Sequence, residues 1–543
     1  MSTTVGFNRL KTDIEKSTNI YDILAAANIA LGPYSPTIES SFNRRNYSDL
    51  IEHVNAFDHN EVTFPQFRDN VLTWLSSIDT ASTNATSSYV YALIHCIDSI
   101  YSYKGYASGD PSESHKLEVI SSLNDIYVNN MQILPRFEGN DNTTIAVKMY
   151  LSSKAERGFR ERIPKESDDI NSVLKNFDIF PRHFGKPSVK IHRFTTRISK
   201  QISERLNNKG DKLTVGLYPL WAGNLRKTWN IHYLETTFTI TGMGKKEEER
   251  MLKRFKAALE RCKKRGVDIA IFPELTMTRE NLEEVQNSIK SMMGKCPILM
   301  VLGTIWEVYS ENGIEFKQNV SVVMSNWGEI LFEQQKQSSF LSQKPGHIYP
   351  EDGNAKGHKE ELSFNEKTVN VIDIEGVGRF CTLICRDILK TTLISFMERL
   401  LADVVLVPAF SPSSNGLKTK LKSLVAGYRS TILLCNCCSA LHAWKDKDED
   451  YWIPKEILEK NIIREDKPDE KKEGVWELGF IMTPAKNKTS ATDYVNPLNM
   501  SHSCINCQDN DVCHGGIFDI HYLNYLQPDS EKPGRIEIIR GST

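Results

Sequence analysis

Three side chains that could act together in covalent catalysis each follow an apolar, strand-like run. Glu274 comes after Ile-Ala-Ile-Phe-Pro, Cys385 comes after Phe380–Ile384, and Lys336 ends the segment Glu329–Lys336. A carboxylate can act as a general base, a thiol as a nucleophile, and an ammonium group can stabilise an oxyanion. Because α/β folds place functional groups at strand ends, these three residues are candidate catalytic residues.

Each of the three also has a plain structural interpretation. A Cys at a strand end is more often a small core residue, and a Glu after a strand or a lone Lys is usually solvated. A helix is predicted just beyond Cys385, and a helix N-terminus lowers a thiol pKa and offers backbone donors to an oxyanion. Together with Lys336, this predicts a depressed pKa for the Cys385 thiol, which a charge on Glu274 would oppose.

The motifs around these residues, taken in order, resemble the carbon–nitrogen hydrolase (nitrilase) superfamily. They are Phe-Pro-Glu-Leu at Glu274, Gly-Glu-Ile-Leu before Lys336, Ile-Cys-x-Asp at Cys385, and Ala-Asp-Val-Val-Leu-Val-Pro at 402–408. The match covers about residues 212 to 525, and it includes Arg429, Gly479 and Pro484. The resemblance implies an α/β fold, a four-layer α-β-β-α sandwich, and assembly as a homo-oligomer.

The resemblance also implies a reaction. Cys385 would attack the carbon of an amide, nitrile or carbamoyl group and form a thioester or thioimidate. Glu274 would accept the thiol proton, and Lys336 with the backbone N–H of Arg386 would stabilise the oxyanion. The superfamily needs neither a metal nor a cofactor, so none is predicted.

Many members carry a second glutamate between the Lys and the Cys. Glu360 is the favoured candidate and Glu361 the next, although either could be one acid of a charged loop. The sequence departs from the family pattern at Arg386, where an aromatic residue is more common, and after Arg429, where a glutamate is missing. The loop 353–366 is also long. Substrate identity and the choice between hydrolysis and acyl transfer therefore stay open.

The 543 residues divide into three parts by composition. Residues 1–180 show helical spacing, for example in Phe67–Ile78 and Leu117–Met131, and predict an all-helical domain of unknown role. Residues 181–211 are predicted to be a basic linker. Residues 212–543 alternate strands and helices, which predicts the nitrilase-like domain.

Between 182 and 212 there are nine Lys or Arg residues against two acids. The favoured interpretation is a solvated connector containing a short helix, and the alternative is a strip that binds a nucleic acid or another polyanion. The net charge of −2 argues against nucleic-acid or membrane binding by the protein as a whole but leaves local patches open.

Eleven cysteines without a secretory signal predict reduced thiols and a cytoplasmic protein. His502, Cys504, Cys507, Cys513 and His514 could bind zinc, but the spacing matches no standard finger, and a reduced Cys-rich loop is the preferred interpretation.

Two functions from different classes remain. The leading one is a hydrolase acting on a small amide or nitrile, with the helical domain available to a protein partner. The alternative is a nitrilase-like scaffold or binding protein in a signalling or anti-phage defence assembly.

Overall fold

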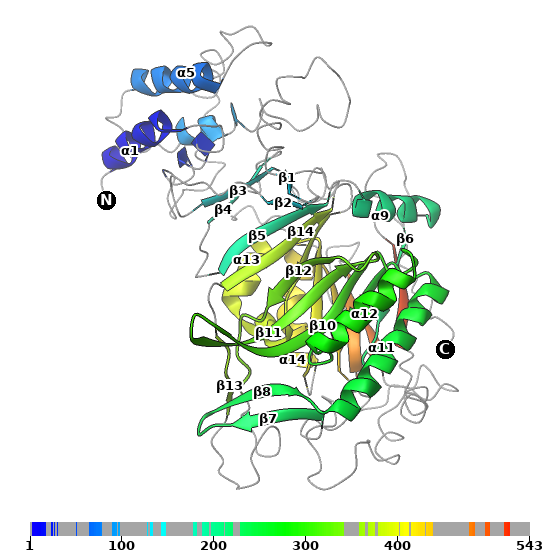
Figure 1. Cartoon of the computed structure of the whole chain (residues 1–543). Coiled ribbons are helices and arrows are strands. Elements are labelled where there is room, and N and C mark those ends of the chain that lie inside the picture. Colours follow the sequence, from blue (N-terminus) through cyan, green and yellow to red (C-terminus); the bar gives the residue numbers. More distant parts are fainter. Residues whose placement is uncertain are drawn as a thin grey trace. The chain divides into compact units, whose positions relative to one another are not determined.

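In the computed structural model the chain forms two compact units, Met1–Phe194 and Thr195–Thr543. Figure 1 shows the elements of both. The described residues are 3–17, 23–24, 26–27, 30, 50, 64–78, 89–94, 96–97, 127–128, 131–133, 143–147, 177–181, 187–194, 197–210, 212–220, 228–341, 358–363, 367–374, 378–400, 402–411, 414–428, 430–437, 477–483, 495–499 and 515–521.

The first unit contains both helices and strands. Helix α5 (Phe64–Ser77) confirms the helix predicted at Phe67–Ile78, and α1 (Thr3–Glu15) packs its buried Leu10 and Ile14 inward. The strands are β1 (Tyr127–Val128), β2 (Met131–Ile133), β3 (Thr143–Val147), β4 (Phe177–Pro181) and β5 (Pro187–Phe194). In this unit β1 pairs with β2, β2 with β5, and β3 with β4, all antiparallel.

These strands correct the prediction that residues 1–180 are all helical. The runs Thr-Thr-Ile-Ala-Val in β3 and Phe-Asp-Ile-Phe in β4 are rich in β-branched and aromatic residues, which favour strands. The helix predicted at Leu117–Met131 also overlaps β1 and the first residue of β2. Helical spacing of a few apolar residues did not outweigh these local preferences.

The second unit is a mixed α/β structure with two large sheets. In the first sheet the order is β12-β11-β10-β9-β6-β20, and β9 runs parallel to β6 and β10. Its strands are β6 (Lys212–Leu217), β9 (Ile269–Phe272), β10 (Leu299–Glu311), β11 (Ile314–Ser325), β12 (Ile330–Gln335) and β20 (Gly516–His521).

In the second sheet, the strands of this unit follow the order β14-β15-β16-β17-β18-β19, and β15, β16 and β17 are parallel. They are β14 (Lys367–Ile374), β15 (Gly378–Thr382), β16 (Val404–Ala409), β17 (Thr431–Asn436), β18 (Glu477–Met482) and β19 (Val495–Asn499). A smaller sheet joins β7 (Trp229–Tyr233), β8 (Thr237–Met243) and β13 (Lys359–Glu360). The alternation of strands and helices predicted for residues 212–543 is thereby found in the described part of this unit.

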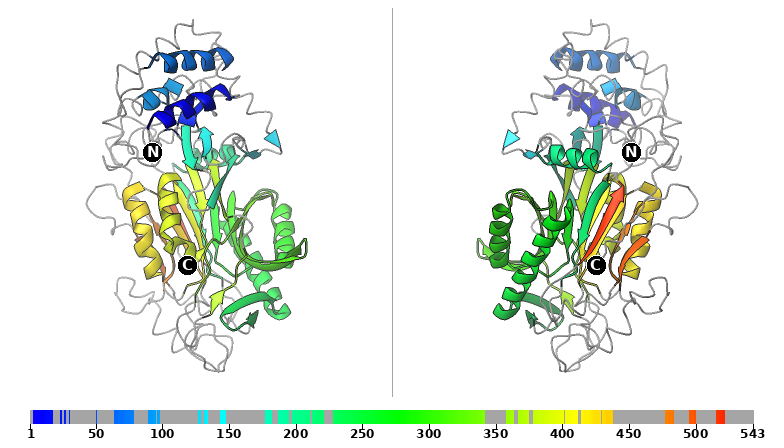
Figure 2. Two further views of the ribbon diagram at one scale, coloured as in Figure 1. Left: turned by 90° about the vertical axis from the view of Figure 1, so that its left-hand side faces the viewer. Right: turned by 90° about the vertical axis from the view of Figure 1, so that its right-hand side faces the viewer.

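Two pairs of helices accompany the two large sheets, one pair with each sheet (Figure 2). Helices α11 (Lys245–Arg265) and α12 (Arg279–Ser291) bury apolar faces in one core with β9, β10 and β11. Helices α13 (Thr391–Leu400) and α14 (Asn415–Tyr428) lie beside the second sheet. Gly266, in the left-handed conformation at φ 61°, ends α11 and turns the chain into β9.

One further helix, α9 (Arg197–Asn208), precedes β6 and lies within the segment predicted as a linker. Among the described residues, no helix is both long and apolar enough to cross a membrane.

Candidate active site

Glu274 lies in a tight turn at the end of β9. Its backbone N–H donates to the carbonyl of Ala409 (3.3 Å), at the end of β16 in the other sheet. The next residue, Leu275, has φ 59°, and its N–H donates to Thr304 Oγ1 (3.0 Å). Bonds to β10 and to β16 therefore fix the turn on both sides, and the Glu274 side chain is only 2% exposed.

Gly303 in β10 makes this turn possible. A Cβ at that position would lie 2.3 Å from the carbonyl oxygen of Pro273 and 2.3 Å from Thr276 Oγ1. Its φ of 81° is also one that side chains rarely adopt. The backbone of β10 thus approaches the Glu274 turn more closely than any other residue type would allow.

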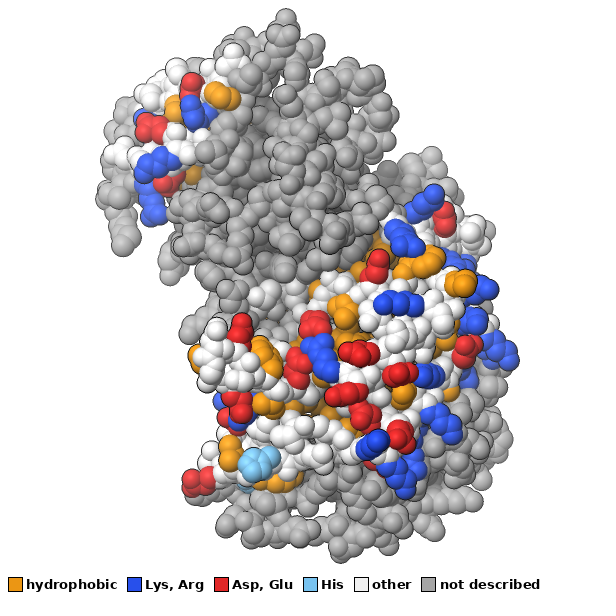
Figure 3. Space-filling view, viewed as in Figure 1, with side chains coloured by type: hydrophobic (Ala, Val, Ile, Leu, Met, Phe, Trp, Pro, Cys, Tyr) orange, Lys and Arg blue, Asp and Glu red, His pale blue; other side chains and the backbone are white. Residues whose placement is uncertain are grey.

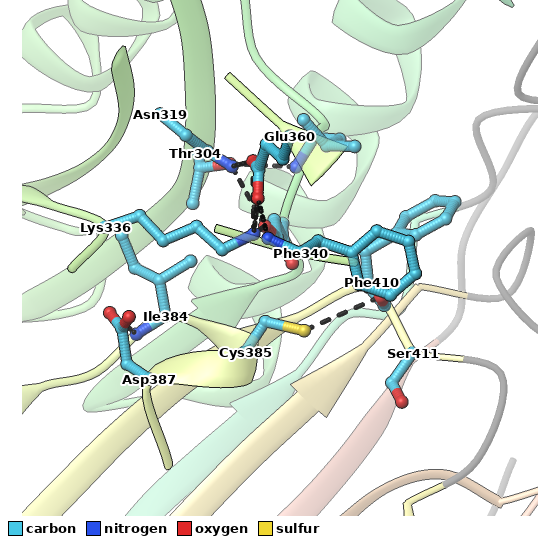
Figure 4. A network of polar contacts seen from close by, with 12 residues as sticks. Thr304, Asn319, Lys336, Phe340, Glu360, Ile384, Cys385, Asp387, Phe410 and Ser411 are labelled. Atoms are coloured by element: carbon cyan, nitrogen blue, oxygen red, sulfur yellow. Dashed lines mark hydrogen bonds and ion pairs between the residues drawn. The ribbon is translucent and has the colours of Figure 1, made fainter. Parts of the chain in front are cut away.

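Lys336 follows β12 and is held between two carboxylates. Its Nζ donates to Glu274 Oε1 (2.6 Å) and to Glu360 Oε2 (2.9 Å), and the three side chains are 2–3% exposed. Asn319, on β11, donates its amide to Glu274 Oε1 (2.9 Å) and to Glu360 Oε1 (3.3 Å). Figure 4 shows Lys336 and Asn319 converging on Glu360.

Glu360 is fixed by backbone contacts as well. Its Oε2 accepts from the N–H of Phe340 (2.6 Å), and its own N–H donates to the carbonyl of Phe340 (2.7 Å). Glu361 instead binds Lys317 (2.8 Å), and the hydrogen bond with Lys317 lowers the pKa of Glu361. Of the two acids considered from sequence, the structure brings Glu360 to Lys336.

Cys385 begins a 3₁₀ helix, η4 (Cys385–Leu389), directly after β15. Its φ is 46°, in the left-handed region that a non-glycine residue adopts only at a steric cost. The thiol donates to the carbonyl of Phe410 (3.6 Å), as drawn in Figure 4, and lies within hydrogen-bonding reach of Glu274. The sharp turn presents the sulfur to the buried carboxylate and ammonium groups.

The pKa of the Cys385 thiol is raised well above its usual range, which corrects the expectation of a depressed value. Burial is the largest cause, and the negative charge of Glu274 adds to it; Lys336 acts in the opposite direction. Because η4 is one short turn of 3₁₀ helix, it gives the thiol little of the dipole expected from a longer helix. The resting nucleophile is therefore a neutral thiol that needs a base.

The surroundings of Lys336 and of Glu360 favour their charged forms to different degrees. Burial disfavours the charged form of Lys336, but the adjacent Glu274 and Glu360 outweigh it, and the pKa of Lys336 is raised. Burial raises the pKa of Glu360, while the positive charge of Lys336 lowers it. Lys336 is thus a fixed cation at any ordinary pH.

Asp387 connects the two catalytic segments. Its carboxylate accepts from the N–H of Gln337 (2.9 and 3.1 Å), next to Lys336, and from the N–H of Ile384 (3.2 Å), next to Cys385. Burial raises the pKa of Asp387 to about 7 against these backbone donors.

Arg386 was also predicted as a site residue, but its side chain is not part of the cluster. Its guanidinium donates to the carbonyl of Leu341 (3.4 Å), and among the described residues it makes no hydrogen bond or ion pair with Glu274 or Lys336. Arg386 entered the prediction for its backbone N–H, and that role remains a prediction.

Asn319 and Asp387 were not predicted as site residues. Asp387 had a signal, because it is the acid of Ile-Cys-x-Asp, and so did Asn319, because it begins the strand-like run that leads to the turn and Gly-Glu-Ile-Leu before Lys336. No group of His, Cys, Asp and Glu that could bind a metal occurs in the part of the chain described here. The Cys-rich segment 502–514, Arg429 and Pro484 lie outside that part.

No family model matches the sequence. No curated protein matches it either.

Structural comparison matches the chain to members of the nitrilase superfamily, among other structures. NitN amidase from Nesterenkonia sp. AN1 has 13% sequence identity and a TM-score of 0.32, over 59% of this chain and 96% of that one. Nit3 from Saccharomyces cerevisiae, described as a member of branch 10 of the nitrilase superfamily, has 13% identity and a TM-score of 0.30, over 55% and 94%. A glutamine-dependent NAD+ synthetase from Acinetobacter baumannii has 18% identity and a TM-score of 0.27, over 42% and 38%. The functional conclusion below rests on the site geometry.

Proposed function

We propose that the protein is a carbon–nitrogen hydrolase that cleaves a small amide or nitrile through a thioester or thioimidate on Cys385. The observation that supports it is the buried Lys336 ammonium between Glu274 and Glu360, with Glu274 in reach of the thiol. A buried ion cluster is expensive to desolvate and does not stabilise a fold better than apolar packing would. Its position beside a strained cysteine favours a catalytic role.

In the proposed reaction with an amide, Glu274 accepts the thiol proton while the Cys385 sulfur bonds to the carbonyl carbon, whose π electrons move to oxygen. When the C–N bond breaks, Glu274 returns that proton to the leaving nitrogen. Glu274 then takes a proton from water as the water oxygen attacks the thioester. The C–S bond breaks, the sulfur regains the proton, and a carboxylic acid is released.

Lys336 has three N–H donors; Glu274 Oε1 accepts from one (2.6 Å), and in this proposal the two oxygens of Glu360 (2.9 and 3.2 Å) share another. A remaining donor is available to the oxyanion of the tetrahedral intermediate, where a preorganised cation in a buried site acts most strongly. The backbone N–H of Arg386 is the second donor in this proposal. Glu360 and Asn319 hold Lys336 and Glu274 in position.

We also propose that the second unit is the four-layer α-β-β-α sandwich of the superfamily. Two large sheets, each accompanied by a pair of helices, support this arrangement.

Intact-mass spectrometry tests the proposed function. After incubation with a panel of small amides and nitriles, we expect a covalent adduct that peptide mapping places on Cys385. The adduct should be absent from Cys385→Ala, which should keep its fold because the thiol is a small part of the core. If no substrate in a broad panel forms an adduct, and Cys385→Ala retains full biological activity, the protein is a scaffold rather than an enzyme.

A further inference from the structure

Exposed Lys and Arg side chains gather where α9 meets the C-terminal end of α11. We call this surface the basic rim, and Figure 3 shows blue side chains over these elements. It is defined by Arg197, Lys200, Arg205, Lys263, Lys264 and Arg265, all of which are exposed.

Direct contacts join α9 to the other elements of the basic rim. Lys209, just after α9, donates to the carbonyl of Gly266 (2.9 Å) and to buried Asp268 (2.7 Å). At the other end of α9, the Arg197 guanidinium lies 3.9 Å from the centre of the Trp327 ring. The Trp327 loop touches the segment after α12, because Asn326 donates to the carbonyl of Gly294 (3.1 Å). The rim therefore continues toward Lys290 and Lys295, which are also exposed.

The charge of this surface is one-sided. In α9 and the last two turns of α11 the acids are Glu204 and Glu260, and Glu260 pairs with Lys263 at 3.5 Å. At the opposite end of α11, by contrast, the segment Lys-Lys-Glu-Glu-Glu-Arg contains three bases and three acids. The strong positive potential is thus local, in a chain whose net charge is −2.

Helix stability does not explain all of these cations. Lysines at the end of α11 interact favourably with the negative end of the helix dipole. Arg197 and Lys200 lie in the first turn of α9, where the positive end of the dipole disfavours them. Their presence there calls for a partner with negative charge.

We propose that the basic rim binds the phosphate backbone of a nucleic acid. The 12 residues of α9 extend for about 18 Å, a length that faces several consecutive phosphates. At the edge of the rim, the Arg197 guanidinium packs on the half-buried Trp327 ring, which holds this cation at the surface near Lys200. A membrane surface fits less well, since interfacial binding needs an apolar face, and Met293 is the large exposed hydrophobic residue next to this rim.

Fluorescence anisotropy with the full-length protein and labelled random-sequence DNA and RNA oligonucleotides tests the proposal. The test variant is Lys263→Gln/Lys264→Gln. The matched control is Lys245→Gln/Lys246→Gln, which removes the same two charges from the other end of the same helix. We expect the rim variant to bind at least about 10-fold more weakly and to lower the salt slope by about 2, with the control within about 2-fold of the unchanged protein.

Circular dichroism should show that both variants remain folded, because all four lysines are exposed and their interactions with the helix dipole are weak. Equal weakening in the two variants would overturn the proposal, as would the absence of binding at low salt. Binding to vesicles containing an anionic lipid, with none to oligonucleotides, would also overturn it and would indicate a membrane surface instead.

Discussion

Among the residues of the site, Cys385 and Lys336 are both kept protonated by one neighbour. The charge of Glu274 raises the pKa of both groups, so it keeps the thiol neutral and the ammonium charged. The same carboxylate is the proposed base. Removing its charge should therefore change thiol acidity and turnover in opposite directions.

Glu274→Gln should shift the pH dependence of Cys385 alkylation to lower pH while lowering turnover by roughly 10² to 10⁴-fold, since general-base catalysis contributes about that much. Peptide-level mass spectrometry after iodoacetamide treatment measures the first effect, and Cys96, Cys262 and Cys296 serve as internal controls. Burial raises the pKa of these three to between about 11 and 12. Unaltered turnover in Glu274→Gln would remove Glu274 from the mechanism.

Asp387→Asn should change how stability depends on pH. Because the pKa of Asp387 is raised from 3.8 to about 7 in the folded protein, the folded state holds a proton that the unfolded chain has lost. The proton on Asp387 contributes fully to the stability of the folded state below about pH 4, and this contribution is lost as pH rises through about 7. The stability of the unchanged protein relative to Asp387→Asn should fall by up to about 4 kcal/mol over this range.

Urea unfolding at several pH values measures this difference. A difference that is independent of pH would mean that Asp387 keeps an ordinary carboxyl pKa in the folded state.

At the residue scale, sequence was sufficient for side chains whose chemistry is distinctive and whose motifs are ordered. Glu274, Lys336 and Cys385 were found in this way, and the structure brings their side chains together. Asn319 stood in the motif before Lys336 but was given no role, because its contacts with Glu274 and Glu360 depend on the tertiary position of β11.

Among the elements, the turn after β9 depends on the backbone of β10. Gly303→Ala should displace this turn, because the new Cβ would meet backbone and Thr276 Oγ1 at 2.3 Å, and because φ 81° is strained for alanine. We expect destabilisation of about 1–3 kcal/mol and a large loss of turnover.

Thermal unfolding together with a turnover assay checks this expectation. The control is Gly313→Ala, at the tip of the β10–β11 hairpin, where φ is 78° but nothing lies within 4 Å of the added Cβ. It shares the backbone strain without the clash, so its turnover should be unchanged. Equal turnover in the two variants would show that the close approach at Gly303 does not position Glu274.

Elements with continuous apolar runs were predicted well. The runs that became β9, β15, β16 and β17 are buried on both faces, and this burial is what their composition indicates. The strands of the first unit were missed because their polar neighbours break the alternation that marks a strand. Helix α9 was expected only as a short helix in a connector, and its contact with Asp268 could not be read from sequence.

For the molecule as a whole, resemblance to the superfamily predicts a homo-oligomer. Light scattering coupled to size exclusion should give a mass of at least twice 61.8 kDa at micromolar concentration. A stable species at the mass of one chain would contradict this prediction. The basic excess at 182–212 indicated part of the basic rim, but the part formed by the end of α11 depends on tertiary contacts such as that of Lys209 with Gly266.

The left-handed backbone at Cys385 also limits which residues can ever occupy that position. At φ 46° a β-branched side chain meets a severe steric penalty, so threonine cannot serve as an alternative nucleophile there. Serine, alanine, asparagine and glycine can be accommodated, and of these serine alone retains a nucleophilic side chain of similar size. The backbone geometry that points the sulfur at the catalytic groups thus restricts the nucleophile at position 385, in evolution and in engineering, to cysteine or serine.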